Sequence, residues 1–398
     1  MIVGVCGAGT MGAGIAQVCL AAGHEVLLYD VDHEAIDRGR ERIRAGLARL
    51  VEKGRLEAAA RDEMLDAVRD AHDLGALGEE AELVIEAAYE DLDLKRTIFR
   101  SLDRSARPEA MLATNTSALS VTDIAAATSH PGRVLGLHFF NPAPVMPLVE
   151  VVAGEATRAD VHARGMEFAR GSGKTPVACR DAPGFIVNRV NRPFTLEALR
   201  LVDDDSAGGP VATIDQVDRA IEASGYPMGP FRLMDLVGID VNLAVAKALY
   251  EAFDHEARFR PSPLQEALVA AGTLGRKSGR GFYRYDEGGA AVADDGPVDV
   301  PGRGGTTVAP RSTVSDREIV ERIELAIVNE AYHAVGEDVA APDDIDRAIK
   351  LGAGHPHGPF ERAGTLGLRR VIEGLQGLQQ LEGDRFRPAP ALWSVATL

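Results

Sequence analysis

The first thirty residues place the strongest constraint on the fold. Ile2 to Cys6 is a short apolar run of the buried-strand type, and it leads directly into Gly7-Ala8-Gly9-Thr10-Met11-Gly12, a G-x-G-x-x-G pattern. A helical pattern over Gly14 to Ala22 and a second strand, Glu25 to Tyr29, follow, and Asp30 comes next. A strand, a glycine turn, a helix, a strand and an acid in this order predict an α/β, Rossmann-type domain that binds a dinucleotide.

The glycine turn and Asp30 indicate which dinucleotide is bound. Gly7 permits a tight turn, Gly9 lets the backbone approach a pyrophosphate at the helix N-terminus, and Gly12 lets helix and strand pack closely. Asp30 can accept hydrogen bonds from ribose hydroxyls and would repel a 2′-phosphate, so we predict NAD as the cofactor. The predicted contacts within the turn are Gly7, Gly9, Thr10, Met11 and Gly12.

Polar side chains follow the next two predicted strands. Glu90 and Lys95 come after the strand Leu83 to Glu86, and Ser117 comes after the strand Met111 to Thr114. Doubly wound sheets bind their ligands at the carboxyl ends of the strands, which is where these residues are expected. Ser117 could contact a ligand, or it could be an ordinary turn residue.

Residues 33–73 form a polar insertion that we predict to be a helical hairpin projecting from the sheet. At the helical period of 3.6 residues, its first helix carries two nearly opposite stripes. The apolar stripe consists of Ile36, Ile43, Leu47 and Leu50. The basic stripe consists of Arg38, Arg42, Arg49 and Lys53. The basic stripe could receive the phosphates of a nucleotide-bearing substrate, or it could be a solvated face balanced by nearby glutamates.

The segment around His138 carries the residues best suited to acid–base chemistry. Val134 to Leu137 and Leu148 to Val152 are strand-type runs, and prolines exclude a helix between them. The chain must therefore loop and return, which can bring Glu150 beside His138. A carboxylate fixes the tautomer of a histidine, and such a histidine suits proton abstraction from an alcohol. A capped core histidine beside an unrelated surface glutamate is the alternative interpretation.

The pattern becomes helical after residue 182. Helices are predicted over Phe185 to Val202, Ile214 to Ser224, Leu236 to Phe253 and Pro263 to Ala271. A stretch rich in Gly, Pro, Ala and Asp, Gly288 to Thr313, is typical of a flexible linker. We predict an NAD-binding domain over 1–182, a helical domain over 183–285, a linker over 286–313 and a further helical region over 314–398.

The last region repeats part of the helical domain. The octapeptide that begins at Ile214 is echoed by the one that begins at Pro342, and Tyr226 to Phe231 is echoed by His355 to Phe360. Spacing changes by only a residue or two between the pairs, which predicts a duplication. The second copy lacks the glycine-rich end of the first and has no evident match to Pro183–Arg189. We therefore expect the second copy to carry no catalysis.

Charge and cysteine content restrict the class of protein. The net charge of -17 argues against a nucleic-acid surface as the main function. No apolar run is long enough to cross a membrane. The three cysteines have no metal-type spacing, so we expect a reducing, cytoplasmic setting and no metal site.

These motifs together resemble the 3-hydroxyacyl-CoA dehydrogenase family. The resemblance covers residues 1 to about 285 in the family's order. The matching segments are Gly7–Gly12, Asn115–Ser117, Gly136–Pro142, Leu148–Val152, Asp181–Arg189 and Tyr226–Phe231. Some bacterial members, including 3-hydroxybutyryl-CoA and 3-hydroxyadipyl-CoA dehydrogenases, also carry a second helical copy, as residues 314–398 do.

The resemblance implies a role for each matching residue. His138 is implied as the general base, and Glu150 as its orienting partner. Ser117 and Asn188 are implied to bind the 3-oxygen of the substrate, and Lys53 to face the phosphates of CoA. The residues implied to lie along NAD are Asp30, Glu90, Lys95, Asn115 and Asn141.

The expected reaction is the NAD-dependent oxidation of an (S)-3-hydroxyacyl-CoA to a 3-ketoacyl-CoA. Oxidation of a CoA-free hydroxy acid is one alternative. A non-catalytic NAD-binding structural protein is another, although the set of His138, Glu150, Ser117 and Asn188 is intact. For assembly, we expect either a homodimer through the helical domains or a pseudo-dimer in which the second copy folds back on the first. The acyl chain length and the pathway are left open.

Overall fold

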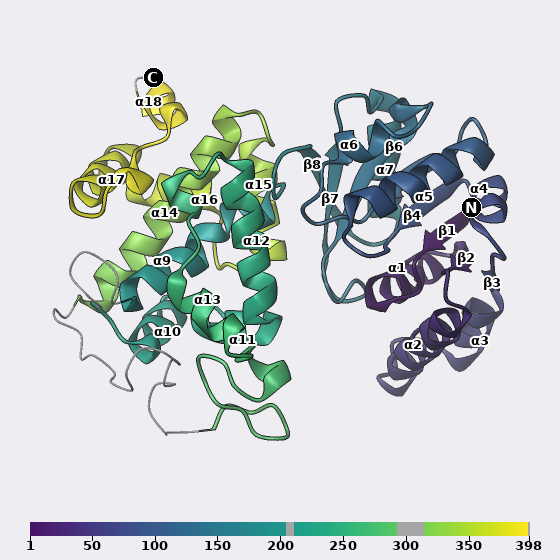
Figure 1. Cartoon of the computed structure of the whole chain (residues 1–398), viewed down its shortest axis with the longest axis horizontal. Coiled ribbons are helices and arrows are strands. Elements are labelled where there is room, and N and C mark those ends of the chain that lie inside the picture. The colour runs from purple at the N-terminus through teal and green to yellow at the C-terminus, as the bar shows by residue number, and fades with distance from the viewer. Residues whose placement is uncertain (204–210, 293–313, 397–398) are drawn as a thin grey trace. The chain divides into compact units, whose positions relative to one another are not determined.

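The computed structural model describes residues 1–203, 211–292 and 314–396. It divides into two compact units, Met1–Phe185 and Ile186–Leu398. The first unit contains a sheet with helices, and the second is helical (Figure 1). The predicted fold class is therefore confirmed. Most of the predicted linker, residues 293–313, lies outside the described residues.

Eight strands form one sheet in the first unit, in the order β3-β2-β1-β4-β5-β6-β7-β8. The strands are β1 (Ile2–Cys6), β2 (Glu25–Tyr29), β3 (Val68–Asp70), β4 (Leu83–Glu86), β5 (Met111–Thr114), β6 (Val134–Phe139), β7 (Leu148–Ala153) and β8 (Thr175–Arg180). Neighbouring strands are parallel except β6 and β7, which are antiparallel. The strand order reverses between β1 and β4. In doubly wound sheets, ligands bind outside the carboxyl ends of the strands at this kind of reversal.

Helices connect the strands and cover the sheet. They are α1 (Thr10–Ala21), α2 (His33–Glu52), α3 (Ala58–Asp66), α4 (Leu74–Glu80), α5 (Leu92–Ser105), α6 (Val121–Ala125) and α7 (Ala159–Gly171). The core of the unit includes fully buried strand residues such as Val3, Val5 and Ile85, together with Ile15 of α1. The apolar stripe of α2 joins this core, because Ile36, Ile43 and Leu47 are buried.

Two predictions about the start of this unit were wrong. Helix α1 begins at Thr10 and not at Gly14, so it starts within the glycine turn. The hairpin ends at Asp66, because Val68–Asp70 forms an edge strand that pairs with β2. Only Val68 of that strand is buried. The strand therefore lacks the alternation of apolar and polar residues by which a strand is recognised in a sequence.

The second unit contains two successive sets of helices. The first set is α8 (Val187–Val190), α9 (Arg192–Val202), α10 (Ile214–Ala223), α11 (Pro230–Val237), α12 (Ile239–Ala252), the short 3₁₀ turn η2 (Ala257–Phe259) and α13 (Pro263–Ala270). The second set is α14 (Asp316–Gly336), α15 (Pro342–Gly352), α16 (Pro359–Leu366), α17 (Leu368–Glu382), the 3₁₀ turn η4 (Asp384–Phe386) and α18 (Pro390–Ala396).

Two predicted helices of the first set are interrupted. The helix expected over Phe185 to Val202 is divided at Asn191, and Phe185 has a φ of 49° and stays outside it. The helix expected over Leu236 to Phe253 is divided at Gly238, whose φ of 108° ends α11 and starts α12 in a new direction. Apolar periodicity continues across both breaks, so it did not reveal them.

The two sets repeat one another in structure as well as in sequence. Asp218 accepts two backbone N–H groups at the start of α11, at 3.0 and 3.1 Å. Asp346 accepts two at the start of α16, at 2.8 and 3.0 Å. Gly238 between α11 and α12 has its counterpart in Gly367 between α16 and α17, which has a φ of 85°. The predicted duplication is therefore visible in matching caps and matching turns.

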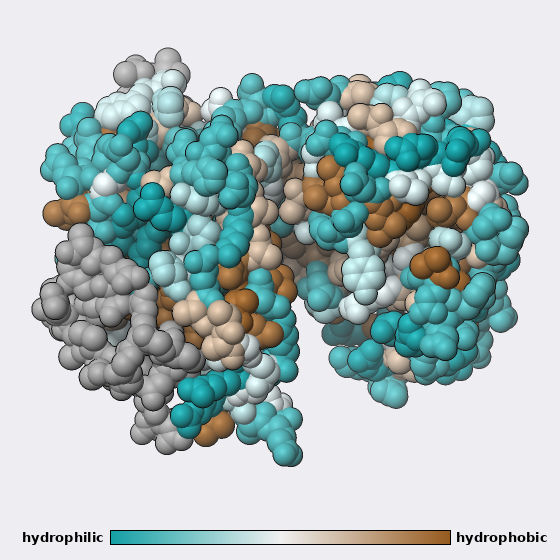
Figure 2. All heavy atoms as spheres, viewed as in Figure 1, coloured by the Kyte–Doolittle hydropathy of each residue, from teal (hydrophilic) through white to brown (hydrophobic). Residues whose placement is uncertain are grey.

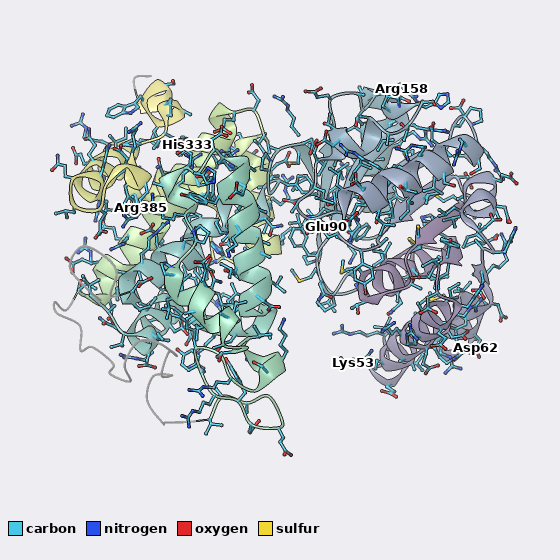
Figure 3. All side chains as sticks on the ribbon, viewed as in Figure 1. Lys53, Asp62, Glu90, Arg158, His333 and Arg385 are labelled. Atoms are coloured by element: carbon cyan, nitrogen blue, oxygen red, sulfur yellow. The ribbon has the colours of Figure 1, made fainter. Side chains whose placement is uncertain are left out.

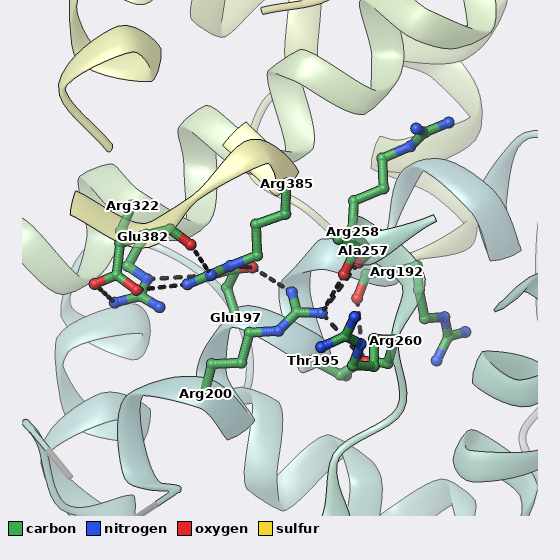
Figure 4. A network of polar contacts seen from close by, with 10 residues as sticks. All are labelled: Arg192, Thr195, Glu197, Arg200, Ala257, Arg258, Arg260, Arg322, Glu382 and Arg385. Atoms are coloured by element: carbon green, nitrogen blue, oxygen red, sulfur yellow. Dashed lines mark hydrogen bonds and ion pairs between the residues drawn. The ribbon is translucent and has the colours of Figure 1, made fainter. Parts of the chain in front are cut away.

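Each copy contributes one buried glutamate that pairs with two arginines of the other copy. We call this arrangement the exchange of carboxylates. Glu330 of α14 lies 2.7 Å from Arg189 and 2.8 Å from Arg258, both in the first copy. Conversely, Glu197 of α9 lies 3.0 Å from Arg322 and 3.2 Å from Arg385, both in the second copy (Figure 4). Burial alone would raise the pKa of Glu197, but Arg200, Arg322 and Arg385 lower it to about 2.

This exchange identifies a relationship that the sequence comparison missed. Arg189 precedes Glu197 by the same spacing as Arg322 precedes Glu330. Helix α14 is therefore the counterpart of α8 and α9, and Arg322 takes the place of Arg189. Ile186 and Val187 have identical counterparts in Ile319 and Val320, so only part of Pro183–Arg189 lacks a match in the second copy. Residues 316–318 differ from Pro183–Phe185, and Glu321 stands in place of Asn188, which is why the repeat was not recognised there.

Candidate active site

The glycine turn between β1 and α1 leaves room for a ligand at the helix N-terminus. Gly7 has a φ of 106°, and a Cβ there would lie 2.7 Å from the carbonyl oxygen of Ala87. A Cβ on Gly12 would lie 1.8 Å from the carbonyl oxygen of Gly7. A Cβ on Gly9 would meet nothing within 4 Å, so the space beside this residue is open. Tight packing below an open helix N-terminus suits a pyrophosphate. In the same turn, Thr10 is exposed and Met11 is half-buried.

Asp30 stands next to this turn, directly after β2. One of its carboxylate oxygens accepts the backbone N–H of Ala8 at 2.8 Å, and the other accepts that of Asp32 at 3.1 Å. These bonds hold a half-buried acceptor beside the glycine turn. The position and charge of Asp30 fit the ribose hydroxyls of a dinucleotide.

Glu90 connects the ends of β4 and β5. Its Oε1 accepts hydrogen bonds from the hydroxyl of Thr116 at 2.6 Å, from the backbone N–H and hydroxyl of Ser117 at 2.9 and 3.3 Å, and from the backbone N–H of Ala118 at 3.2 Å. Its Oε2 lies 3.4 Å from Nζ of Lys95. Burial alone would raise the pKa of Glu90, but the Lys95 ammonium and these hydrogen bonds hold it below its usual value. Glu90 and Ser117 therefore belong to one connected group.

His138 and Glu150 face each other across β6 and β7. They are directly paired residues of the antiparallel ladder, and Nδ1 of His138 lies 2.6 Å from Oε2 of Glu150. The contact expected from the sequence is present. Glu150 is fully buried and His138 is 6 % exposed. With Glu150 ionised, Nδ1 donates to the carboxylate and Nε2 is left as the basic nitrogen.

Aromatic rings flank His138. The ring of Phe140 lies 4.5 Å from the imidazole between centroids, and that of Phe185 lies 5.8 Å away. Asn115 fixes the strand that carries His138, because its Oδ1 accepts the backbone N–H of Phe139 at 2.8 Å. The imidazole is therefore held by a carboxylate on one side and by apolar rings around it.

The other predicted residues are described by their own surroundings. Asn141 is exposed just after β6, and Lys53 is exposed at the end of α2 (Figure 3). Asn188 lies on α8 and is partly buried within the second unit. In the basic stripe, Arg38 pairs with Asp32 at 2.8 Å and with Glu34 at 3.3 Å. Part of the stripe is thus balanced by neighbouring acids, as the alternative interpretation expected.

Sequence reasoning missed several residues that build the site. Glu86 is fully buried, although it ends an otherwise apolar strand, and it contacts Lys95 and Thr114. Thr116 is 1 % exposed and binds Glu90. An acid at the end of an apolar strand was the available signal for Glu86. Thr116 offered no comparable signal, because a threonine between two other polar residues is common in turns.

In the part of the chain that the structure describes, no group of three His, Cys, Asp or Glu side chains could hold a metal ion. None of the helices within residues 1–203, 211–292 and 314–396 is both long and apolar enough to cross a membrane. Most of the surface visible in Figure 2 is hydrophilic.

Comparison with known proteins gives this geometry a family. The model of the 3-hydroxyacyl-CoA dehydrogenase NAD-binding domain matches residues 2–182. The model of the C-terminal domain of the same enzymes matches residues 184–285 and again residues 319–398. The chain belongs to the 3-hydroxyacyl-CoA dehydrogenase family. Its cofactor is NAD, and it is an oxidoreductase, as the resemblance predicted.

Relatives within the family cover the chain fully or in part. The chain is 38% identical to 3-hydroxyadipyl-CoA dehydrogenase of Escherichia coli, over 100% of this chain and 97% of the relative. It is 46% identical to 3-hydroxybutyryl-CoA dehydrogenase of Mycobacterium tuberculosis, over 71% of this chain and 98% of the relative. The crystal structure of 3-hydroxybutyryl-CoA dehydrogenase from Escherichia coli matches with a TM-score of 0.88 and 36% identity, and covers 100% of this chain and 98% of that one. The second helical copy is thus present in some family members.

Proposed function

We propose that this chain oxidises an (S)-3-hydroxyacyl-CoA to the 3-ketoacyl-CoA, with His138 as the general base. The observation that carries the proposal is the buried contact of 2.6 Å between His138 and Glu150. A histidine whose Nδ1 is held by a carboxylate presents Nε2 to a hydroxyl and can take its proton. When bound, NAD would supply the redox chemistry, as the acceptor of the hydride from C3.

The other residues of the proposed active site then have separate roles. Glu150 stabilises the imidazolium that forms when His138 takes the proton, as the acidic member of a catalytic triad does. Ser117 and Asn188 are proposed to bind the 3-oxygen, which holds the hydroxyl in place for proton transfer. Phe140 and Phe185 exclude water from the imidazole, which strengthens its electrostatic contact with Glu150.

The dinucleotide side uses the residues at the sheet edge. The glycine turn is proposed to cradle the pyrophosphate, and Asp30 to accept the ribose hydroxyls. We propose that Glu90, Lys95, Asn115 and Asn141 line the rest of the cofactor's path. Lys53 is proposed to meet the CoA phosphates, which is supported by its exposure at the end of α2.

The assembly proposed here is a pseudo-dimer within one chain. It is supported by the exchange of carboxylates between the copies, in which Glu197 and Glu330 each bind two arginines of the other copy. We further propose a cytoplasmic setting, which is supported by three buried cysteines that form no disulfide in the part of the chain that the structure describes.

The deciding experiment is NADH formation from 3-hydroxybutyryl-CoA, measured beside free 3-hydroxybutyrate. Longer and dicarboxylic hydroxyacyl-CoAs are included, since relatives are named for both butyryl and adipyl substrates. We expect turnover of the thioesters only, and their order of kcat/KM gives the acyl preference. Turnover of the free acid alone would contradict the proposal and assign the chain to the CoA-free alternative. Absence of turnover with every substrate would favour a non-catalytic role.

A further inference from the structure

We propose that Glu86 is a positioning residue that fixes the substrate-binding loop Asn115–Ala118 through Lys95 and Glu90. The proposal deepens the proposed function and rests on it, because it assigns Ser117 to the substrate. Glu86, Thr114 and Thr116 are each at most 1 % exposed, so any effect they have on the reaction must pass through other residues.

Glu86 is the buried starting point of the connection. It is fully buried at the end of β4, and its hydrogen bonds involve both carboxylate oxygens. Oε1 accepts from Nζ of Lys95 and from the backbone N–H of Ala88, each at 2.7 Å. Oε2 accepts from the hydroxyl of Thr114, also at 2.7 Å. Because Thr114 ends the neighbouring strand β5, Glu86 ties the carboxyl ends of β4 and β5 together.

Lys95 carries the connection from Glu86 to Glu90. Its side chain is 1 % exposed, and its ammonium group lies 2.7 Å from Glu86 and 3.4 Å from Glu90. A buried ammonium group needs a compensating carboxylate, and Glu86 is the closer and more buried of the two. The position of Lys95 is therefore set by Glu86, and Lys95 in turn faces the Oε2 of Glu90.

Glu90 carries the connection to the loop. Its Oε1 accepts four hydrogen bonds from residues 116–118, while its Oε2 faces Lys95. Thr116 anchors the loop further, because its hydroxyl also accepts the backbone N–H of Leu119 at 3.0 Å. Rotation of the Glu90 carboxylate toward Lys95 would break the bonds to the loop, so the charge on Lys95 must be balanced elsewhere. Glu86 supplies that balance.

Stability alone is a weak reason for this arrangement. Buried ion pairs can often be replaced by apolar residues of similar volume with little loss of stability. Glu86, Lys95 and Glu90 are instead linked in series, and Glu90 binds the loop Asn115–Ala118. This arrangement specifies one position for the loop. This is the reason for assigning the group to positioning.

The test is a double-mutant cycle with Glu86→Gln and Thr116→Val. Both changes keep the size of the side chain and remove a charge or a hydroxyl from the connection. We expect each variant to lower kcat/KM for 3-hydroxybutyryl-CoA by about 10- to 100-fold, as for loss of a hydrogen bond to a charged group. The double variant should lose clearly less than the product of the two, because both act through one loop.

A matched control separates positioning from general destabilisation. Asp103 and Arg133 form another buried pair in the same unit, 2.7 Å apart and 4 % and 3 % exposed. Asp103→Asn should lower the Tm as much as Glu86→Gln while kcat/KM of the folded enzyme stays unchanged. Wild-type kcat/KM in Glu86→Gln, or losses that multiply in the double variant, would overturn the positioning role. Wild-type enzyme that oxidises no hydroxyacyl-CoA would instead overturn the proposed function.

Discussion

At the scale of single residues, His138 and Glu150 are held by the register of a strand pair and not by a flexible loop. Their Cα atoms are paired across β6 and β7, and both side chains lie on the same face of the sheet. This placement leaves little freedom to the imidazole, which suits a base that must meet a hydroxyl in one orientation. In the proposed function, Ser117 and Asn188 hold the substrate hydroxyl whose proton the imidazole takes.

Replacement of His138 tests its proposed role. His138→Gln keeps a hydrogen-bonding side chain of similar size and removes the base. We expect turnover of 3-hydroxybutyryl-CoA to fall by ~10²–10⁴-fold, while the Kd for NAD, measured by fluorescence titration, stays close to wild type. The control is His130→Gln, at a side chain that is 68 % exposed and pairs with Asp103. Equal turnover in His138→Gln and the control would exclude His138 as the base.

Residue identity and spacing were enough to predict the pair of His138 and Glu150. They were not enough to predict the connected group that includes Glu86, Lys95 and Glu90. Prolines between two apolar runs forced the chain to return, so the contact of Glu150 with His138 followed from local sequence. The contact of Glu86 with Lys95 depends on how the end of β4 meets α5, and that of Glu90 with Ser117 on how the ends of β4 and β5 meet. Sequence alone does not give either distance. For the same reason, the connection through Glu86 became visible only in three dimensions.

At the scale of elements, the strands were predicted closely and the helix breaks were not. The bounds of β2, β4 and β5 agree with their predicted ranges, because each is a short apolar run followed by a polar residue. The divisions at Asn191 and Gly238 depend on the packing of the second unit, and apolar periodicity continues through both. The edge strand β3 was missed because pairing with β2, and not its own composition, makes it a strand.

The exchange of carboxylates between helical copies can be tested at the element scale. Glu330→Gln would leave Arg189 and Arg258 without their buried counter-charge, so we expect the second unit to lose ~3–5 kcal/mol of unfolding free energy. The control is Asp215→Asn, which breaks an exposed pair with Arg219 at 2.8 Å in the same unit. That control should cost far less, because water and salt screen an exposed pair. Chemical denaturation followed by far-UV circular dichroism measures both, and similar losses would argue against the exchange as a stabilising contact.

At the scale of the whole molecule, the duplication determines how the helical unit is completed. Helix α14 packs against α9, and α10 of the first copy packs against α14 of the second. The two copies also meet at the repeated segments, where the ring centroids of Tyr226 and His355 lie 4.8 Å apart. Each copy therefore buries surface that it could not bury alone.

Removal of the second copy tests the pseudo-dimer. The full chain should elute as a monomer of about its calculated mass of 42.3 kDa in size-exclusion chromatography with light scattering. A chain that ends at residue 292 should dimerise or aggregate, because the second-copy partners of Arg189, Arg258 and Glu197 are lost with α14 and the segment around Arg385. A soluble, monomeric and fully active shortened chain would contradict the pseudo-dimer.

The covalent link between the copies also affects how the protein responds to dilution. Two separate subunits associate in a second-order step, so a dimer dissociates when its concentration falls below the Kd. Two copies on one chain meet in a first-order step, so their effective concentration does not depend on the concentration of the chain. The contact between α9 and α14 therefore forms equally well at low and at high abundance. Specific activity should accordingly be insensitive to the level at which a cell expresses the protein.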